Sequence, residues 1–495
     1  MIGVAVFLTA MGLWNFRLLL NPALSLAKGQ ISFPKFVESV QNYYTESLSA
    51  KYDFVNLNGW FAWLTKQTFS NDVVWLNNGM LGVEQNKFDN PSANANSMIE
   101  FNRFLLDHGI PFLFIQAPHK MDPDCTLLPV GVANVYNANA GALIEVLEEG
   151  GVRVLDLRAS IAGTPELVEQ NFFITDHHWT YTGALTAFRE IVREIESVSG
   201  ESELDFSRAD PSHWESHVLE NAYLGSQGQR TGIYFAGMDD FVYYTPKPAD
   251  MRRISCAIFD TEEFYRGDFS DAILREERLS ARDYFDSHLY YLYVGGGHSL
   301  VQLRNPDAPN DLKILIIKDS FATPILGYAS VLFREVDVID PRHYNGSIAE
   351  YALFSQPDIV IELLTTVSDS VFYTYGLETV SKDTQDSLFE AELVRDGSIS
   401  IELAPGQAYV LTFDDVELEG SAATVALYDS YGKRIDSAIF DVEYCRENGG
   451  FSALFCVPGS AGENLELRFH AGTDDAASDG SATYRSVRLE SFDPA

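Results

Sequence analysis

Cysteine and basic residues are scarce in this 495-residue sequence, and each shortage excludes a class of protein. The four cysteines, Cys125, Cys256, Cys445 and Cys456, lack the paired short spacings of a zinc site and are too few for a disulfide-dense scaffold. Lys and Arg number 34 against 71 Asp and Glu, a net charge of −37. Because nucleic acids and anionic lipids need clusters of basic residues, we expect no nucleic-acid partner and no peripheral lipid binding. The cysteine spacings give no sulfur metal site, and we expect no metal and no cofactor.

Internal repeats and low-complexity tracts are also lacking, apart from a Gly, Ala, Ser and Asp stretch at 472–481 that is typical of a loop. Hydrophobic residues make up 46% of the chain and aromatic residues 13%, which excludes disorder as the main state. At roughly 100 to 200 residues per domain, the length predicts two to four domains.

The N-terminal segment lacks both the unbroken run of about 18 apolar residues of a clean membrane span and the basic start of a signal peptide. Residues 1–14 are nevertheless almost wholly apolar, and a second apolar patch follows Arg17. We expect 1–30 to be an uncleaved membrane anchor or export signal, with a buried first helix as the alternative. A Cys445–Cys456 disulfide would indicate an oxidising compartment; two buried free thiols are the other interpretation.

Alternating strand and helix patterns between 96 and 364 predict an α/β domain with a parallel sheet flanked by helices. Five apolar runs have the character of buried strands, at 111–117, 152–157, 312–317, 336–339 and 358–363. Helical patterns lie between them at 97–107, 140–149 and 182–198. Between 201 and 310 the pattern changes to Tyr-rich short strands with frequent Gly, which we expect to form an inserted β-rich lid over the active edge.

After about residue 381 the helical pattern disappears and alternating strands predict a C-terminal β-sandwich. The predicted strands are 398–403, 408–413, 423–428, 451–456, 465–470 and 484–489. Such a module either binds carbohydrate or is a passive stabilising unit, and its tyrosines fit both. The chain thus divides into an N-terminal segment at 1–30, an α/β domain at 31–380 that contains the 201–310 insertion, and a sandwich at 385–495.

A cluster of titratable residues, Asp176, His177 and His178, stands just before the helix predicted at 182–198. It puts a carboxylate and two imidazoles at a loop-to-helix junction, where catalytic groups are commonly held. Taken alone, the cluster also fits a hydrogen-bonded loop or a partial metal site.

A second feature is the apolar strand 312–317, which runs through Lys318 and Asp319 into Ser320 and then a helix. This order exposes a hydroxyl at the carboxyl end of a central strand, with the Ser N–H near a helix N-terminus where an oxyanion can develop. A Ser hydroxyl needs an imidazole base, and the imidazole needs a partner that fixes its tautomer.

The Asp-His-His-Trp string at 176–179, followed about 140 residues later by Asp-Ser-Phe at 319–321, resembles the DHHW proteins and the alginate O-acetyltransferases of the SGNH-hydrolase-like superfamily. These families carry the Asp-x-His element ahead of the Ser strand, in circularly permuted order, and this chain has that order. The resemblance covers roughly 33–367. Further matching strings are Ala-Pro-His-Lys at 117–120, Gly-Ser at 225–226, Arg-Thr-Gly at 230–232, Gly-Gly-Gly-His at 295–298, Asp-Pro-Arg at 340–342 and Pro-Asp at 357–358.

The resemblance implies a catalytic triad of Ser320 as nucleophile, His178 as general base and Asp176 as the residue that orients His178. His177 is then a hydrogen-bonded structural residue, and Trp179 packs beneath the site.

Four further residues are implied near the substrate. Gly296 and Gly297 correspond to the oxyanion-hole element, where the family pattern has Gly-Gly-Asn and this sequence has three glycines. Arg342 matches an Arg near the pocket, with an ion pair to Asp340 as the alternative, and Lys120 is a loop cation after the first strand.

These roles together imply an O-acetyltransferase of the cell envelope, held at the outer face of the cytoplasmic membrane or released outside it. Ser320 would take an acetyl group delivered by a membrane-bound acyltransferase and pass it to a polysaccharide hydroxyl. The acidic surface favours a neutral glycan as acceptor. An acetyl esterase acting on glycans is one alternative, and a catalytically decayed glycan-binding or assembly protein, indicated by Gly297, is the other.

Overall fold

The computed structural model describes residues 23–28, 32, 35–37, 51–199, 204–247, 253–280, 284–285, 287–365, 375–377, 388–395, 397–417, 420–471 and 482–492. The predicted anchor at 1–30 lies almost wholly outside this set, as does the predicted loop at 472–481. Among the helices of the described ranges, none has the length and hydrophobicity that a bilayer crossing requires.

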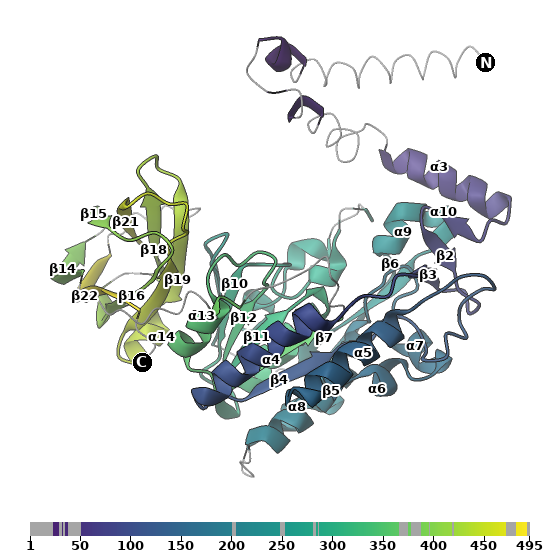
Figure 1. Ribbon diagram of the computed structural model, residues 1–495, viewed down its shortest axis with the longest axis horizontal. Helices are drawn as coiled ribbons and strands as arrows, with labels where there is room; N and C mark the ends of the chain where they lie inside the picture. Colours follow the sequence, from purple (N-terminus) through teal and green to yellow (C-terminus); the bar gives the residue numbers. More distant parts are fainter. Residues whose placement is uncertain are drawn as a thin grey trace.

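An eight-stranded mixed sheet forms the centre of the molecule, in the order β5-β4-β13-β11-β12-β10-β8-β9 (Figure 1). Its strands are β4 (Phe112–Gln116), β5 (Arg153–Asp156), β8 (Ile254–Ile258), β9 (Glu263–Gly267), β10 (Leu300–Arg304), β11 (Asn310–Lys318), β12 (Phe333–Ile339) and β13 (Ile359–Leu364). The parallel half, β5 to β12, contains the five strands predicted from the sequence. Within it β5 is an edge strand whose side chains are partly exposed rather than buried.

The other half of the sheet differs from the wholly parallel prediction. β10 is antiparallel to both of its neighbours, β12 and β8. β8 is antiparallel to β9 because it turns directly into β9 through residues 259–262, whereas a parallel pair would need a long crossover. Part of the 201–310 segment therefore extends the central sheet. The rest forms a separate pair of strands, β6 (Trp214–Tyr223) and β7 (Asp239–Pro246), with the short helices α9 (Ser226–Thr231), α10 (Ile233–Ala236) and α11 (Phe269–Ala272).

Helices cover both faces of this sheet. Along β11, Ile314 and Ile316 point into one hydrophobic core, and Leu315 and Ile317 point into the other. The first core includes α8 (Tyr181–Ser199) and α12 (Thr323–Leu332); the second includes α4 (Ser92–Asp107), α5 (Tyr136–Glu149) and α13 (Ile348–Ser355). Burial of β11 on both faces explains its continuous apolar sequence.

Smaller elements surround this centre. They are α3 (Lys51–Leu64), α6 (Arg158–Ala162), α7 (Pro165–Asn171), the strands β1 (Phe69–Ser70), β2 (Val73–Trp75) and β3 (Leu81–Val83), and the 3₁₀ turns η2 (Ser207–Ala209), η3 (Pro211–His213), η4 (Glu276–Arg278), η5 (Leu289–Tyr291) and η6 (Ser320–Ala322). β1 to β3 form their own antiparallel sheet.

The C-terminal part is a pair of antiparallel sheets that contains all six predicted strands. One sheet has β14 (Phe389–Arg395), β22 (Thr483–Ser491), β16 (Ala408–Phe413) and β20 (Phe451–Cys456), with β17 (Asp415–Glu417) paired to β22. The other has β15 (Gly397–Glu402), β21 (Asn464–Ala471), β18 (Ala422–Asp429) and β19 (Arg434–Asp441), which leads into α14 (Val442–Glu447). All four cysteines are free thiols, so the structure has no Cys445–Cys456 disulfide.

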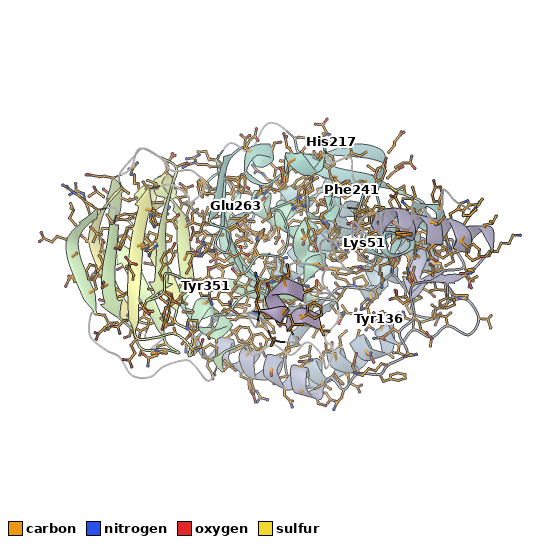
Figure 2. The ribbon with its side chains drawn as sticks, turned by 90° about the horizontal axis from the view of Figure 1, so that it is seen from above. Lys51, Tyr136, His217, Phe241, Glu263 and Tyr351 are labelled. Atoms are coloured by element: carbon orange, nitrogen blue, oxygen red, sulfur yellow. The ribbon has the colours of Figure 1, made fainter. Side chains whose placement is uncertain are left out.

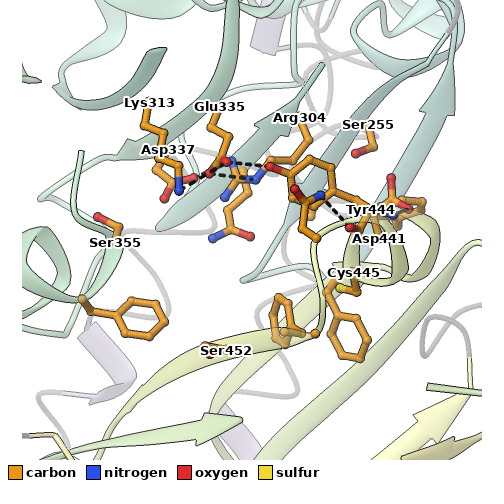
Figure 3. A pocket seen from close by; sticks show the side chains of 18 residues that line it. Ser255, Arg304, Lys313, Glu335, Asp337, Ser355, Asp441, Tyr444, Cys445 and Ser452 are labelled. Carbon is orange, nitrogen blue, oxygen red and sulfur yellow. Dashed lines mark hydrogen bonds and ion pairs between the residues drawn. The ribbon is translucent and has the colours of Figure 1, made fainter. Parts of the chain in front are cut away.

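Polar contacts join the sandwich to strands β9 and β12 of the central sheet. Arg266 on β9 pairs with Asp441 at 2.8 Å, and the Tyr444 hydroxyl donates to Glu335 at 2.6 Å. Between the sandwich and the central sheet lies a cavity of about 440 Å³, whose wall includes the Arg304–Asp337 ion pair (Figure 3). The sandwich thus forms one end of the molecule, and α3 lies at the opposite end (Figure 2).

Candidate active site

Ser320 stands on a braced turn at the carboxyl end of β11. Asp319 caps this turn, because its Oδ1 accepts the Phe321 N–H at 2.8 Å. The other oxygen, Oδ2, accepts the backbone N–H and the hydroxyl of Thr365, at 2.8 and 2.5 Å. Thr365 directly follows β13, so Asp319 ties together the ends of two neighbouring strands and holds the Ser320 turn in place.

A chain of hydrogen bonds links Ser320, His178 and Asp176. The Ser320 Oγ lies 2.8 Å from His178 Nε2, across 142 positions of sequence. On the far side of the ring, His178 Nδ1 lies 2.7 Å from Asp176 Oδ1, which also accepts the His178 backbone N–H at 3.0 Å. Because a carboxylate only accepts, Nδ1 carries the proton and Nε2 is the nitrogen that can accept the Ser320 proton.

The carboxylate of Asp176 is buried and fully hydrogen-bonded. Its Oδ2 accepts the Tyr223 hydroxyl and the Ser226 N–H, each at 2.7 Å. Burial alone favours the neutral acid, but the neighbouring His178 and the hydrogen bonds hold the pKa of Asp176 well below its ordinary value. Gly225 allows this approach, since a Cβ there would lie 2.3 Å from the Cβ of Asp176.

The turn that carries Asp176 is fixed by two buried charged side chains. Asp239 on β7 accepts the Ile174 and Thr175 N–H groups at 2.7 and 2.8 Å, and the Thr175 hydroxyl at 2.5 Å. From the other side, Lys120 Nζ lies within hydrogen-bond distance of four acceptors, which share its three protons. They are the carbonyls of Phe173, Ile174 and Asp176, at 3.1, 3.1 and 2.5 Å, and Gln227 Oε1, at 2.7 Å. Burial lowers the pKa of Lys120 to about 7.

Aromatic side chains hold the His178 ring in its plane. Tyr290 stacks on the imidazole with ring centroids 3.9 Å apart, and Phe321 lies at 4.9 Å. Trp179 is completely buried, and its indole Nε1 donates to the Phe321 carbonyl at 2.9 Å. It therefore packs beneath the site, as the sequence predicts.

Ser320 opens into a cavity of about 510 Å³. Its wall includes residues of the β3 edge, the loop after β4, α9 and the Ser320 turn, namely Asp72, Gly82, Val83, Glu84, His119, Lys120, Met121, Asn134, Tyr136, His177, Gln227, Arg230, Asp319, Ser320, Phe321, Arg342 and Thr365. A pocket of this size can take a sugar unit or a small acyl group.

Of the four further residues predicted near the substrate, two line the cavity and two do not. Lys120 and Arg342 line the cavity, although the Lys120 ammonium points into the Asp176 turn and Arg342 makes a bidentate pair with Asp340, at 2.8 and 2.5 Å. Gly296 and Gly297 are not among the described lining residues. A Cβ at Gly297 would lie 3.3 Å from Asp340 Oδ2, and one at Gly296 would lie 4.0 Å from Tyr291.

Asp176, His177 and His178 also form a group whose potential metal-ligand atoms lie within 4.8 Å of one another. Those atoms already have partners, since His177 Nδ1 lies 2.8 Å from the Ser226 hydroxyl and the other two residues form the chain described above. The arrangement fits proton transfer better than metal binding.

Sequence reasoning missed the residues that surround the triad, namely Tyr223, Ser226, Asp239 and Tyr290. The Gly-Ser string at 225–226 was the one available signal, since it places Ser226 at the start of α9. The others come from strands and turns whose local sequences carry no catalytic pattern.

The sheet and this site define a mixed α/β domain of the SGNH-hydrolase-like type, followed by additional β-sheets. The sequence resemblance is confirmed by a family model, because residues 74–261 match the SGNH hydrolase-like domain of acetyltransferase AlgX. That range contains Asp176 and His178 and ends before Ser320.

Solved structures with a similar chain path include Bacillus cereus PatB1 with a sulfonyl adduct, at 19% identity and a TM-score of 0.49, covering 60% of this chain and 96% of that one. A DHHW family protein from Eubacterium siraeum is 16% identical with a TM-score of 0.45, covering 60% and 91%. Pseudomonas aeruginosa AlgX is 12% identical with a TM-score of 0.40, covering 85% and 94%. No curated protein matches the chain.

Proposed function

We propose that this protein is an O-acetyltransferase that acts on polysaccharide hydroxyls through an acetyl-Ser320 intermediate. The observation that carries the proposal is the continuous chain from Ser320 Oγ through His178 to Asp176, with contacts of 2.8 and 2.7 Å. Heavy-atom distances of this size allow direct proton transfer between the hydroxyl and the imidazole. The match of residues 74–261 to an acetyltransferase domain supports the same reaction class.

The reaction proceeds in two half-reactions at the same hydroxyl. In the first, His178 Nε2 takes the Ser320 proton as Oγ bonds to the acetyl carbon of the donor, and then returns that proton to the leaving group. In the second, His178 takes a proton from an acceptor hydroxyl as its oxygen bonds to the acetyl carbon, and gives that proton to Ser320 Oγ as the acetyl–Ser320 bond breaks. Asp176 stabilises the imidazolium in both steps.

The developing oxyanion needs donors near Ser320. The Ser320 N–H is the first donor, because an N–H in the first turn of a helix has no intrahelical acceptor. Gly296 and Gly297 are the additional donors expected from the family resemblance.

The charges around the cavity favour a neutral acceptor. Asp72 and Glu84 are in its wall, and the two arginines there each pair with an acid, Arg230 with Asp72 at 2.5 Å and Arg342 with Asp340. A polyuronate would meet carboxylates without an unpaired guanidinium to offset them. We further propose that 385–495 is a carbohydrate-binding sandwich and that a membrane-bound acyltransferase supplies the acetyl group at the cell envelope.

Turnover of a chromogenic acetyl ester, with and without a neutral oligosaccharide, tests the proposal. We expect acetylated oligosaccharide by mass spectrometry, and a loss of at least about 10³-fold in ester turnover in Ser320→Ala. Ser160→Ala, which removes a hydroxyl bonded to the Leu157 carbonyl, is the matched control.

The other outcomes separate the alternatives. Free acetate with every acceptor tried would make the protein an esterase. Turnover that Ser320→Ala leaves unchanged would exclude the triad, and glycan binding without any turnover would point to a decayed site.

A further inference from the structure

Helix α3 carries an exposed face made almost entirely of large apolar side chains. Phe54, Leu57, Trp60, Phe61 and Leu64, here called the α3 outer face, are each between 40% and 57% exposed. At 100° per residue they fall within about a third of the helix circumference. The neighbouring Trp63 is 60% exposed, and Asp53 is the charged residue within the sector.

The opposite side of α3 packs closely on α9 and α10. Gly59 and Ala62 are buried there, and a Cβ on Gly59 would lie 2.2 Å from the Thr231 carbonyl oxygen. Asn56 Oδ1 accepts the Ile233 N–H at 2.9 Å. α3 is therefore apolar on two sides, whereas a surface helix in water normally has a polar side opposite its buried one.

This helix lies beside the Ser320 cavity. α9, on which α3 packs, supplies Gln227 and Arg230 to the cavity wall. Asn71, which follows α3, donates to the Arg230 carbonyl at 2.7 Å. In Figure 1, α3 lies at the same end of the molecule as α9, α10 and the β2–β3 hairpin. Whatever covers the α3 outer face is separated from α9, and so from the cavity wall, by the thickness of one helix, about 10 Å.

The distribution of charge along the chain indicates what binds the α3 outer face. Residues 1–66 contain five Lys or Arg and three Asp or Glu, whereas residues 67–495 contain 29 and 68. The N-terminal end therefore lacks the acidic excess of the rest of the chain, so the expectation against peripheral lipid binding, which rests on the total charge, does not apply to it. This end also continues from the apolar residues 1–14.

The residue types also suit a bilayer surface. Trp60 and Trp63 are of the kind enriched where lipid headgroups meet acyl chains. Lys51, at the start of α3 (Figure 2), and Lys66, just after its end, can extend their ammonium groups to the headgroups. With 14 residues, α3 is about 21 Å long and cannot cross a core of about 30 Å, so it would lie flat.

We propose that α3 binds a lipid bilayer in the plane of the interface, with its outer face among the upper acyl chains. This contact brings α9, which forms part of the Ser320 cavity wall, to within about one helix thickness of the membrane surface. The proposal stands independently of the reaction at Ser320, because it concerns binding alone.

The test uses the full chain with Trp14→Phe and zwitterionic phosphatidylcholine vesicles whose acyl chains carry bromine, which quenches indole on contact. We expect vesicles to quench the tryptophan fluorescence, and Trp60→Phe with Trp63→Phe to abolish that quenching while keeping the apolar bulk. Trp75, Trp179 and Trp214 remain as a constant background.

A polar variant tests the energetics. Leu57→Gln, Phe61→Gln and Leu64→Gln together should weaken quenching at α3, with vesicle affinity reduced about tenfold or more. The matched control replaces three exposed apolar residues elsewhere, Phe88, Val130 and Tyr431, by Gln and should leave quenching unchanged.

Three results would overturn the proposal. The first is unquenched Trp60 and Trp63 in the presence of vesicles. The second is a dimer in sedimentation experiments that the polar variant dissociates, which would make the face a contact between two copies. The third is protection of Trp60 and Trp63 from aqueous acrylamide without vesicles, which would show that the chain itself covers them. The Trp→Phe pair keeps the test valid if the polar variant fails to fold.

Discussion

The Tyr223 hydroxyl donates a 2.7 Å hydrogen bond to Asp176 Oδ2, from the last position of β6 and 47 residues further along the chain. Together with the Ser226 N–H it occupies the carboxylate oxygen that His178 does not use. This leaves Oδ1 to bind the imidazole and fixes the direction of the carboxylate. The insertion after α8 therefore helps to build the acid–base chain, besides extending the sheet.

Tyr223→Phe should lower ester turnover by about tenfold, because a hydrogen bond to a charged group contributes roughly 1.5 to 3 kcal/mol and its loss frees the carboxylate to turn. The ring would stay in its contact with Phe173 and Phe241. Steady-state kinetics with a chromogenic acetyl ester measure the effect. Tyr243→Phe, on β7, is the control, and equal rates in both variants would show that Tyr223 has no positioning role.

Asp176→Asn should reduce kcat by about 10³- to 10⁴-fold while the fold is kept. The Asp176 carboxylate accepts hydrogen bonds from His178, Tyr223 and Ser226 on its two oxygens, whereas the amide of Asn has one accepting oxygen. If the amide NH₂ faces His178, it donates to Nδ1 and so favours the tautomer that carries its proton on Nε2. The rate is measured beside a thermal unfolding curve. A loss smaller than about tenfold in a folded variant would remove Asp176 from the mechanism.

Gly225→Ala should cost about 100-fold in turnover and should also lower stability, because the new methyl would lie 2.7 Å from the backbone Cα of Asp176. The added methyl would lie 2.3 Å from Asp176 Cβ and 2.5 Å from its Oδ2, so the carboxylate must move, and displacements near 1 Å have this effect on catalysis. Its backbone angles, φ −73° and ψ 178°, are open to alanine. Gly459→Ala, which has no atom within 4 Å of the new methyl, is the matched control. Full activity in Gly225→Ala would contradict the tight contact.

Glu362→Gln should make stability less dependent on pH. Glu362 is completely buried on β13, where the Tyr375 hydroxyl donates to both of its oxygens at 2.9 and 2.8 Å, and burial raises its pKa from 4.5 to about 8. The native protein thus keeps a proton that the unfolded chain loses between these values. Stability should fall as pH rises through this window, by up to about 1.4 kcal/mol per unit.

Urea unfolding at pH 5, 7 and 9 measures this effect. The amide that replaces the Glu362 carboxyl would still accept from Tyr375 but cannot ionise, so the variant should exceed the wild type in stability at pH 9 and approach it at pH 5. Parallel pH profiles for the two proteins would show that Glu362 does not retain its proton in the native state.

The parallel half of the fold could be predicted from sequence because buried parallel strands are continuous apolar runs. β11 shows this directly, with Ile314, Leu315, Ile316 and Ile317 in alternating directions and all buried. The antiparallel half could not, since the partners of β8 and β10 depend on which edge of the sheet remains open. Arg342 had two interpretations from sequence because the direction of a long side chain depends on its neighbours in space, and the structure shows its pair with Asp340.

By itself the sequence determined which chemical groups are present and in what order: an Asp-x-His element, followed by an apolar strand that leads into Ser320. Only the tertiary structure decided that Ser320 and His178 come within 2.8 Å, and that Tyr223, Ser226 and Asp239 surround the Asp176 turn. The physical reason is that these contacts join segments tens to more than a hundred residues apart. Their geometry follows from how the sheet and helices pack, which no local pattern records.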